Sequence, residues 1–153
     1  MEALIKKLNF TNQASALLVN VPPELADLTA ALGARTSVGQ QPESTQSAQF
    51  VMAFVQQLNQ VEQMANWVAA HTKGDAVVWL VYPKQSSKTY TCEFNRDTGW
   101  ASMGAAGFEP VRMVAVNNDW SALRFRRVGF VKKMTRDPKG ALTAEGRSRV
   151  GLG

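Results

Sequence analysis

The stretch Asp75-Ala-Val-Val-Trp-Leu-Val-Tyr-Pro-Lys-Gln-Ser-Ser-Lys88 changes from apolar to polar at its single proline. Residues 76–82 form a short apolar run, which is typical of a strand buried on both faces of a parallel sheet. Pro83 has no N–H to donate to a neighbouring strand, so we expect the strand to end there and residues 84–88 to leave the sheet. These polar residues form either a binding site at the strand end or an ordinary solvated loop.

Three earlier stretches predict further strands. Residues 15–21 and 48–55 are apolar runs of the same kind, and residues 35–38 predict a short strand between them. Leucines at helical spacing predict a helix over 25–32, directly after the first of these strands.

A second helix follows the run at 48–55. Apolar residues at helical spacing over 61–68 predict its buried face, and Gly74 ends it. Asn59 and Glu62 have the spacing of a capping box, so we expect Asn59 to begin this helix.

The last part of the body predicts a helix and a hairpin. Asn95 is placed to cap a helix over 96–106. Residues 109–117 and 120–128 predict two antiparallel strands joined by a tight turn at Asn118-Asp119.

Alternating strands and helices favour an α/β fold. We expect a Rossmann-like three-layer sandwich, with a mostly parallel sheet that ends in an antiparallel C-terminal hairpin. Strands 16–21, 48–55 and 76–82 should lie side by side in the middle of the sheet.

Length and charge divide the chain into two parts. The 153 residues are 45% hydrophobic, which fits a single Rossmann-like domain over 1–130 followed by a basic tail over 131–153. Residues 132–153 contain six basic and two acidic side chains, a net charge of +4, whereas the whole chain carries +5. The body is therefore nearly neutral, which disfavours nucleic acid as its partner and leaves weak binding through the tail as an alternative.

Other features of the sequence predict the cellular compartment of the protein. No apolar stretch is long enough to cross a membrane, and the N-terminus lacks the features of a signal peptide. Cys92 is the only cysteine, so no internal disulfide forms, which fits a soluble cytoplasmic protein with a structural thiol.

A ligand site is expected where the parallel strands end, because open α/β sheets bind ligands beyond the carboxyl ends of their strands. The first residues of an antiparallel neighbour lie at the same edge. The candidate residues at this edge are Asn20, Lys84, Ser86, Ser87, Arg96, Asp119 and Trp120. We expect Trp120, at a turn, to be exposed, and the other tryptophans to belong to the core.

The same edge lacks the usual signals of a cofactor or a catalytic centre. The first strand is followed by Asn20-Val-Pro-Pro-Glu24, which has no glycine and two residues without an N–H. Dinucleotide and S-adenosylmethionine sites need a glycine-rich turn here, so no cofactor is predicted. No metal-ligand spacing occurs, His71 is the only histidine, and no catalytic residue is assigned. A serine–lysine nucleophile at residues 84–88 is the weaker interpretation of that loop.

Several motifs together resemble an uncharacterised bacterial family of the Bacteroidetes type. They are Asn20-Val-Pro-Pro23, Tyr82-Pro-Lys84, Asn95-Arg-Asp-Thr-Gly-Trp100, Trp120-Ser-Ala-Leu-Arg-Phe125, Phe130–Arg136 and Ala141–Gly146. The chain is also similar to a wider domain family of unknown function. The resemblance implies a sheet like that of class I methyltransferases that has lost its cofactor loop, and it implies no reaction.

These observations favour a non-catalytic binding or interaction module over an enzyme. The alternatives are an enzyme that acts on a small anionic substrate at the strand-end crevice, as a degenerate methyltransferase-like protein, and weak nucleic-acid binding through the basic tail. A small anionic ligand and a homo-oligomer both stay open as partners.

Overall fold

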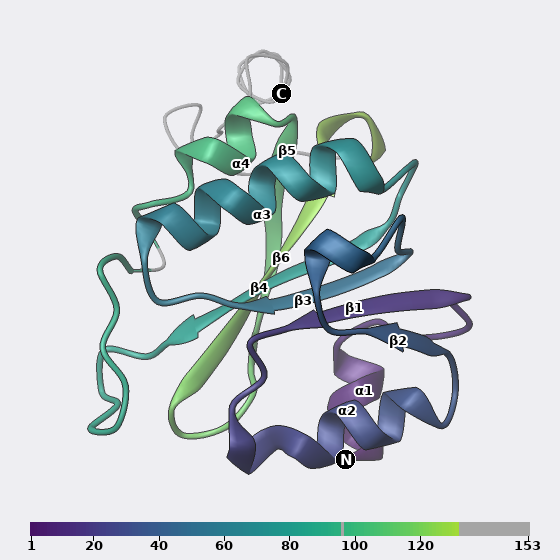
Figure 1. The fold of residues 1–153 in the computed structure, drawn as a ribbon. Helices are drawn as coiled ribbons and strands as arrows, with labels where there is room; N and C mark the ends of the chain where they lie inside the picture. Colours follow the sequence, from purple (N-terminus) through teal and green to yellow (C-terminus); the bar gives the residue numbers. More distant parts are fainter. Residues whose placement is uncertain (96, 132–153) are drawn as a thin grey trace.

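The computed structural model describes residues 1–95 and 97–131. Within these residues, six strands form one sheet in the order β2-β1-β3-β4-β6-β5 (Figure 1). The strands are β1 Ser15–Val19, β2 Ser37–Gly39, β3 Phe50–Phe54, β4 Val77–Pro83, β5 Phe108–Ala115 and β6 Trp120–Arg127.

The first four strands are parallel, and β6 runs antiparallel to both of its neighbours, β4 and β5. The predicted mixed sheet with a C-terminal hairpin is therefore confirmed. So is the prediction that the strands now called β1, β3 and β4 lie side by side. This order makes the chain reverse direction across the sheet between β1 and β3, the position at which such folds bind ligands.

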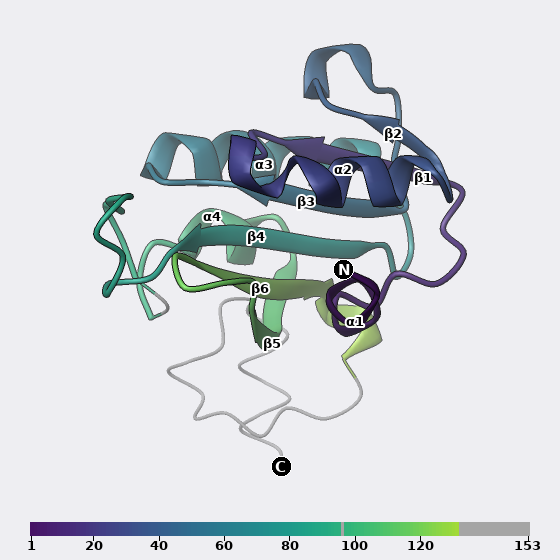
Figure 2. The same ribbon diagram turned by 90° about the horizontal axis from the view of Figure 1, so that it is seen from below.

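Helices cover both faces of the sheet (Figures 1 and 2). Helices α1 and α2 pack on one face, and α3 and α4 pack on the other, so the predicted three layers are present. Their bounds are α1 Glu2–Lys7, α2 Ala26–Gly33, α3 Leu58–His71 and α4 Ala101–Ala105. Short 3-10 turns are formed by Pro23–Leu25, Pro42–Ser44 and Val128–Phe130.

Each layer of helices has its own hydrophobic core. Trp79 and Phe50 belong to the core beneath α1 and α2, whereas Trp67 and Trp100 belong to the core beneath α3 and α4. The prediction that these three tryptophans are core residues is confirmed, since none is more than 8% exposed. Buried aromatic rings of this size contribute strongly to the stability of a domain.

The cap of α3 differs from the prediction. Gln57, not Asn59, is the N-cap residue, and it forms a capping box with Gln60. The Gln60 Oε1 atom accepts from the backbone N–H groups of Gln57 and Gln56, at 3.0 and 2.7 Å. The helix begins two residues earlier than predicted, at Leu58, because Gln57 and Gln60 form the capping box in place of Asn59 and Glu62.

The helix predicted over 96–106 is wrong in length, because α4 contains only its last part. Asn95 does not cap it: its Oδ1 accepts from the Asp97 N–H at 2.8 Å, which closes a turn instead. Gly99 then has a φ of 91°, and a Cβ there would lie 2.6 Å from Phe94 Cβ. A left-handed glycine packed this tightly interrupts a helix that local spacing alone would continue.

Two arginines near the end of β6 fasten the sheet margin to its neighbours. Arg126 forms a bidentate pair with Asp75, with N–O distances of 2.9 and 2.6 Å. Arg127 donates to the carbonyls of Thr72, at 2.7 Å, and Gly74, at 3.0 Å, just beyond the C-terminus of α3. These contacts favour a structural role over phosphate recognition for this pair.

Two further predictions concern the basic tail and membrane-spanning helices. The basic tail lies outside the described residues, apart from Val131, so its role stays a prediction. Over 1–95 and 97–131, no helix combines the length and apolar character that crossing a membrane requires.

Candidate functional site

A pocket of about 430 Å³ lies between the carboxyl ends of β1 and β3, where the strand order reverses. Pockets of this size suit small molecules. The strand ends contribute Val19, Asn20 and Val55, the segment after β2 contributes Gln41, Pro42 and Glu43, and helix α3 contributes Gln60, Gln63, Met64 and Trp67.

Helix α3 holds the segment after β2 in place over this pocket. The Trp67 Nε1–H donates to the Pro42 carbonyl at 3.0 Å. The other face of the Trp67 ring stacks on His71, with ring centroids 4.7 Å apart. The pocket therefore has one rigid wall, formed by a helix and a segment bonded to it.

The lining of this pocket combines amide side chains with a larger apolar surface and carries a single ionisable group, Glu43. No lysine, arginine or histidine is among its lining residues in the described part of the chain. Four side-chain amides, from Asn20, Gln41, Gln60 and Gln63, surround the apolar surfaces of Met64 and Trp67. Because amides both donate and accept hydrogen bonds, this lining suits a ligand with several neutral polar groups.

The turn after β1 has the glycine-free form expected from the sequence. Asn20 adopts a φ of 57°, the left-handed conformation that asparagine tolerates better than most residues. Its Nδ2–H donates to the Phe54 carbonyl at the end of β3, at 3.4 Å. Pro22 and Pro23 follow, so two of the N–H groups that would bind a phosphate at a helix start are missing.

The loop after β4, which contains Lys84 and Ser87, forms another part of the carboxyl edge of the sheet. Asp119, which directly precedes β6, lies beside this loop. The Lys84 N–H donates to the Asp119 carbonyl at 2.8 Å, so backbone pairing continues one residue beyond Pro83. The strand nevertheless ends at Pro83, as predicted, because its last register pair is Pro83 with Trp120. Residues 85–88 then leave the sheet, and Lys84 lies at its carboxyl edge as predicted.

Ser87 has a structural role in this loop. Its hydroxyl donates to Asp119 Oδ1 at 2.8 Å and accepts from the N–H groups of Thr89 and Tyr90, at 3.3 and 3.0 Å. A hydroxyl bonded to a carboxylate and two amides closes a loop, and a lysine does not activate it. The structure thus gives Ser87 no support as a nucleophile.

Trp120 is buried, so the prediction that it is exposed is wrong. Only 2% of the residue is accessible. It pairs with Pro83 at the start of β6, and its ring packs edge-on against Phe54 at 5.1 Å and against Tyr90 at 4.7 Å. The adjacent turn suggested exposure, but the loop after β4 folds back and covers the ring.

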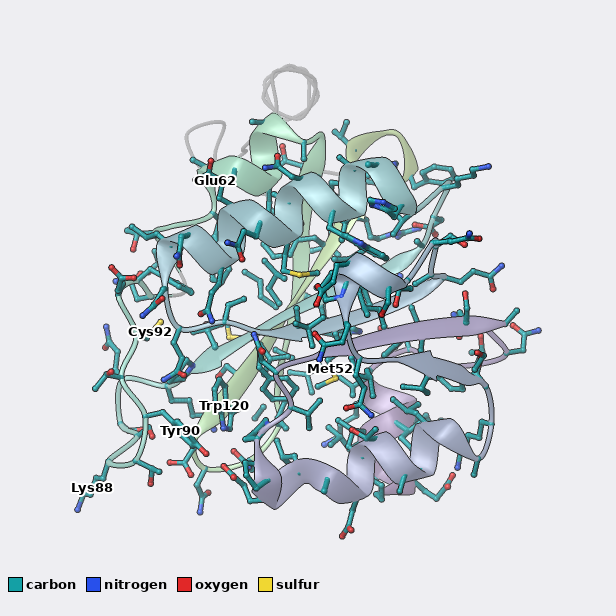
Figure 3. All side chains as sticks on the ribbon, viewed as in Figure 1. Met52, Glu62, Lys88, Tyr90, Cys92 and Trp120 are labelled. Atoms are coloured by element: carbon teal, nitrogen blue, oxygen red, sulfur yellow. The ribbon has the colours of Figure 1, made fainter. Side chains whose placement is uncertain are left out.

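Tyr90 connects that loop to the turn after β1 through Glu24. Its hydroxyl donates to Glu24 Oε1, and this bond lowers the pKa of Glu24 and raises the pKa of Tyr90. The Trp120 Nε1–H also lowers the Glu24 pKa, although this N–H is buried and falls outside hydrogen-bonding geometry. Figure 3 shows Tyr90 beside Trp120, whereas Lys88 points away from the body.

The structure separates the candidate residues into two groups. Asn20 lines the pocket between β1 and β3, whereas Lys84 and Ser86 line another pocket of about 500 Å³ with Asn95 and Ser121. Ser87, Asp119 and Trp120 line neither of these two pockets. Arg96 lies outside the described residues.

Cys92 lies in the same loop and is half-buried. Burial is the main cause that raises the pKa of its thiol, so it is less reactive than an exposed cysteine. Among the described residues, no group of three or more His, Cys, Asp or Glu side chains is placed to hold a metal ion.

Comparison with protein-family models and with curated proteins finds no match. Solved structures do match. A SAM-dependent methyltransferase from Aquifex aeolicus aligns with a TM-score of 0.57 and 12% identity, over 83% of this chain and 89% of that protein. The N-methyltransferase NodS from Bradyrhizobium japonicum aligns with a TM-score of 0.50 and 8% identity, over 82% and 93% of the two chains.

The chain therefore has a methyltransferase-like α/β fold. A further match is SpnF, described as a 4+2 cyclase, with a TM-score of 0.52 and 11% identity over 82% of this chain and 78% of its own. A cyclase among the matches illustrates that this fold does not determine a reaction. The resemblance to a bacterial family stays a prediction.

Sequence reasoning missed the residues that α3 and the segment after β2 place in the first pocket, above all Glu43, Gln63 and Trp67. The segment Gly39–Ser47 is polar and carries no motif that indicates a site. The one signal that could have found the pocket was the predicted strand order, because it places the reversal between β1 and β3.

Proposed function

We propose that this protein is a non-catalytic binding module that holds a small neutral or cationic ligand in the pocket between β1 and β3. The observation that carries the proposal is the composition of the lining: four amides and one carboxylate, with no basic side chain among its described residues. An anionic ligand would lie close to Glu43 without a compensating charge, which costs free energy.

The absence of paired reactive groups in this lining supports binding over catalysis. General acid–base catalysis needs a positioned acid or base with a partner that tunes its pKa, and covalent catalysis needs an activated nucleophile. Glu43 is the only titratable residue of the lining, and it is exposed. Amide and ring contacts, in contrast, orient a ligand without reacting with it.

Calorimetric titration with three probes of different charge tests the proposal. Adenosine is neutral and rich in polar groups, spermidine is a cation, and AMP adds a phosphate to the adenosine framework. We expect saturable binding of adenosine or spermidine, and weaker binding of AMP than of adenosine. No binding of any probe, preference for AMP, or methyl transfer from S-adenosylmethionine to an acceptor would contradict the proposal.

A pair of variants on α3 locates the binding. Gln63→Ala removes an amide from the pocket, whereas Asn66→Ala removes an amide from the same helix but not from the lining. The first should weaken binding about five-fold, the value of one hydrogen bond of about 1 kcal/mol, and the second should not change it. Equal affinities of the two variants would place the ligand elsewhere.

A second candidate is an enzyme that acts on a small anionic substrate beside Lys84. The observation that favours it is the 500 Å³ pocket in which Lys84 and Ser86 face Asn95. Lys84→Gln would then abolish AMP binding and leave adenosine binding unchanged, whereas the first proposal predicts no effect on either probe. Weak nucleic-acid binding through the tail also stays a proposal, tested by its loss at high salt.

A further inference from the structure

Arg112 and Arg124 lie side by side on the face of the hairpin that α1 covers. They are register partners on β5 and β6. Each donates to the same atom, Asn9 Oδ1, with N–O distances of 3.1 Å for Arg112 and 3.3 Å for Arg124. Two guanidinium groups thus share one neutral acceptor.

Neither guanidinium has a carboxylate partner among the described residues. The nearby Asp75 carboxylate is occupied by its bidentate pair with Arg126, and Glu109 lies opposite Arg126 in the strand register. The pair therefore carries a charge of +2 without a direct ion pair among the described residues, and Asp75 acts on Arg124 only through its longer-range charge.

Arg124 has both an unpartnered donor and a perturbed pKa. Its Nε atom is buried and has no hydrogen-bond partner. Burial is the main cause that lowers its pKa; the positive charges of Arg126 and Arg112 lower it further, and the Asp75 carboxylate opposes this. A buried donor without a partner usually indicates a missing acceptor, because leaving it unpaired costs free energy.

The third member, Asn9, is held in place by α1. It follows this helix with a φ of 61°, and the preceding residue, Leu8, accepts a 2.8 Å hydrogen bond from the buried Trp79 Nε1–H. Lys6 and Lys7 in the last turn of α1 add positive charge to the same end of the helix. The Asn9 side chain is therefore positioned before any ligand binds.

We propose that Asn9, Arg112 and Arg124 form a binding site for a phosphate monoester group. A phosphate dianion matches the charge of the two guanidinium groups, and its oxygens accept the paired N–H donors that arginine presents. Its oxygens would accept from the terminal guanidinium nitrogens, which in the structure share the single Asn9 Oδ1 acceptor. This site uses the opposite face from α3 and does not depend on the proposed function.

Titration of the full chain with glycerol phosphate, with glycerol as the uncharged control, tests the site. Arg112→Gln and Arg124→Gln each remove a charge while keeping most of the side-chain length. Each should weaken binding at least about ten-fold, since a hydrogen bond to a charged group contributes about 1.5 kcal/mol or more. Arg35→Gln, which removes an exposed arginine bonded to Glu2, should leave the affinity unchanged.

Circular dichroism and thermal melts show whether each variant folds. If Arg124→Gln does not fold, Arg112→Gln still decides the outcome, because Arg112 is exposed and lies on the edge strand. Glycerol phosphate should also raise the melting temperature of the wild-type chain and not that of Arg112→Gln. No saturable binding by the wild-type chain, or equal binding by Arg112→Gln and Arg35→Gln, would overturn the proposal.

Discussion

Ser87 and Lys84 contribute to the loop after β4 in different ways. Ser87 makes three hydrogen bonds through its hydroxyl, whereas the contact of Lys84 with Asp119 is made by its backbone N–H, which any substitution except proline keeps. Ser87→Ala should therefore destabilise the protein by about 1–2 kcal/mol, and Lys84→Ala by no more than about 0.5 kcal/mol. Urea unfolding measures both, and an equal loss for the two variants would assign Lys84 a structural role.

The bond between Tyr90 and Glu24 predicts a pH dependence. The folded pKa of Glu24 is lowered from 4.5, mainly by the Tyr90 hydroxyl, so its contribution to stability is present above pH 4.5 and lost as pH falls through the lowered value. The folded pKa of Tyr90 is raised from 10.0, mainly by Glu24, so the same contribution is lost as pH rises through that raised pKa.

An NMR titration of the Glu24 carboxyl checks this prediction. In Tyr90→Phe its pKa should rise towards 4.5, because the donor is gone. Tyr82→Phe is the matched control, since the Tyr82 hydroxyl contacts Met113 instead. An unchanged Glu24 pKa in Tyr90→Phe would show that this bond does not form in solution.

At the scale of elements, α3 depends on its glutamine cap. Gln57 is the N-cap residue of the capping box, whereas Asn59 is exposed within the first turn. Gln57→Ala should therefore destabilise the protein by about 1 kcal/mol, as the loss of an N-cap does, and Asn59→Ala by less than about 0.5 kcal/mol. Chemical denaturation of the two variants distinguishes this cap from the one that the Asn59–Glu62 spacing predicts.

At the scale of the whole molecule, one sheet separates two hydrophobic cores. Leu28 is fully buried beneath α2, and Met103 is fully buried on the other face beneath α4. Each change to alanine should cost about 2–5 kcal/mol, and because the two side chains share no contacts across the sheet, the double variant should lose about their sum. Thermal unfolding should stay a single transition, whereas two separate transitions would mean that the cores unfold independently.

The sequence by itself determined the sheet. Residues 15–21, 48–55 and 76–82 are apolar runs that only a doubly covered sheet can bury, and the interleaved helical spacing forces parallel crossovers. The positions of the main strands and the hairpin follow from these local patterns, because burial on both faces leaves few alternatives. The lack of a glycine-rich turn at Asn20-Val-Pro-Pro23 was also evident from the residues alone.

Only the tertiary structure decided how the ends of the elements are arranged. Trp120 is buried because Tyr90, thirty residues earlier, packs against it. Gln63 and Glu43 line the same pocket because Trp67 of α3 is hydrogen-bonded to Pro42, in the segment after β2. The pairing of Arg112 with Arg124 required the register of β5 on β6. Contacts of this kind depend on distances between residues far apart in the chain, and no local pattern of apolar and polar residues encodes them.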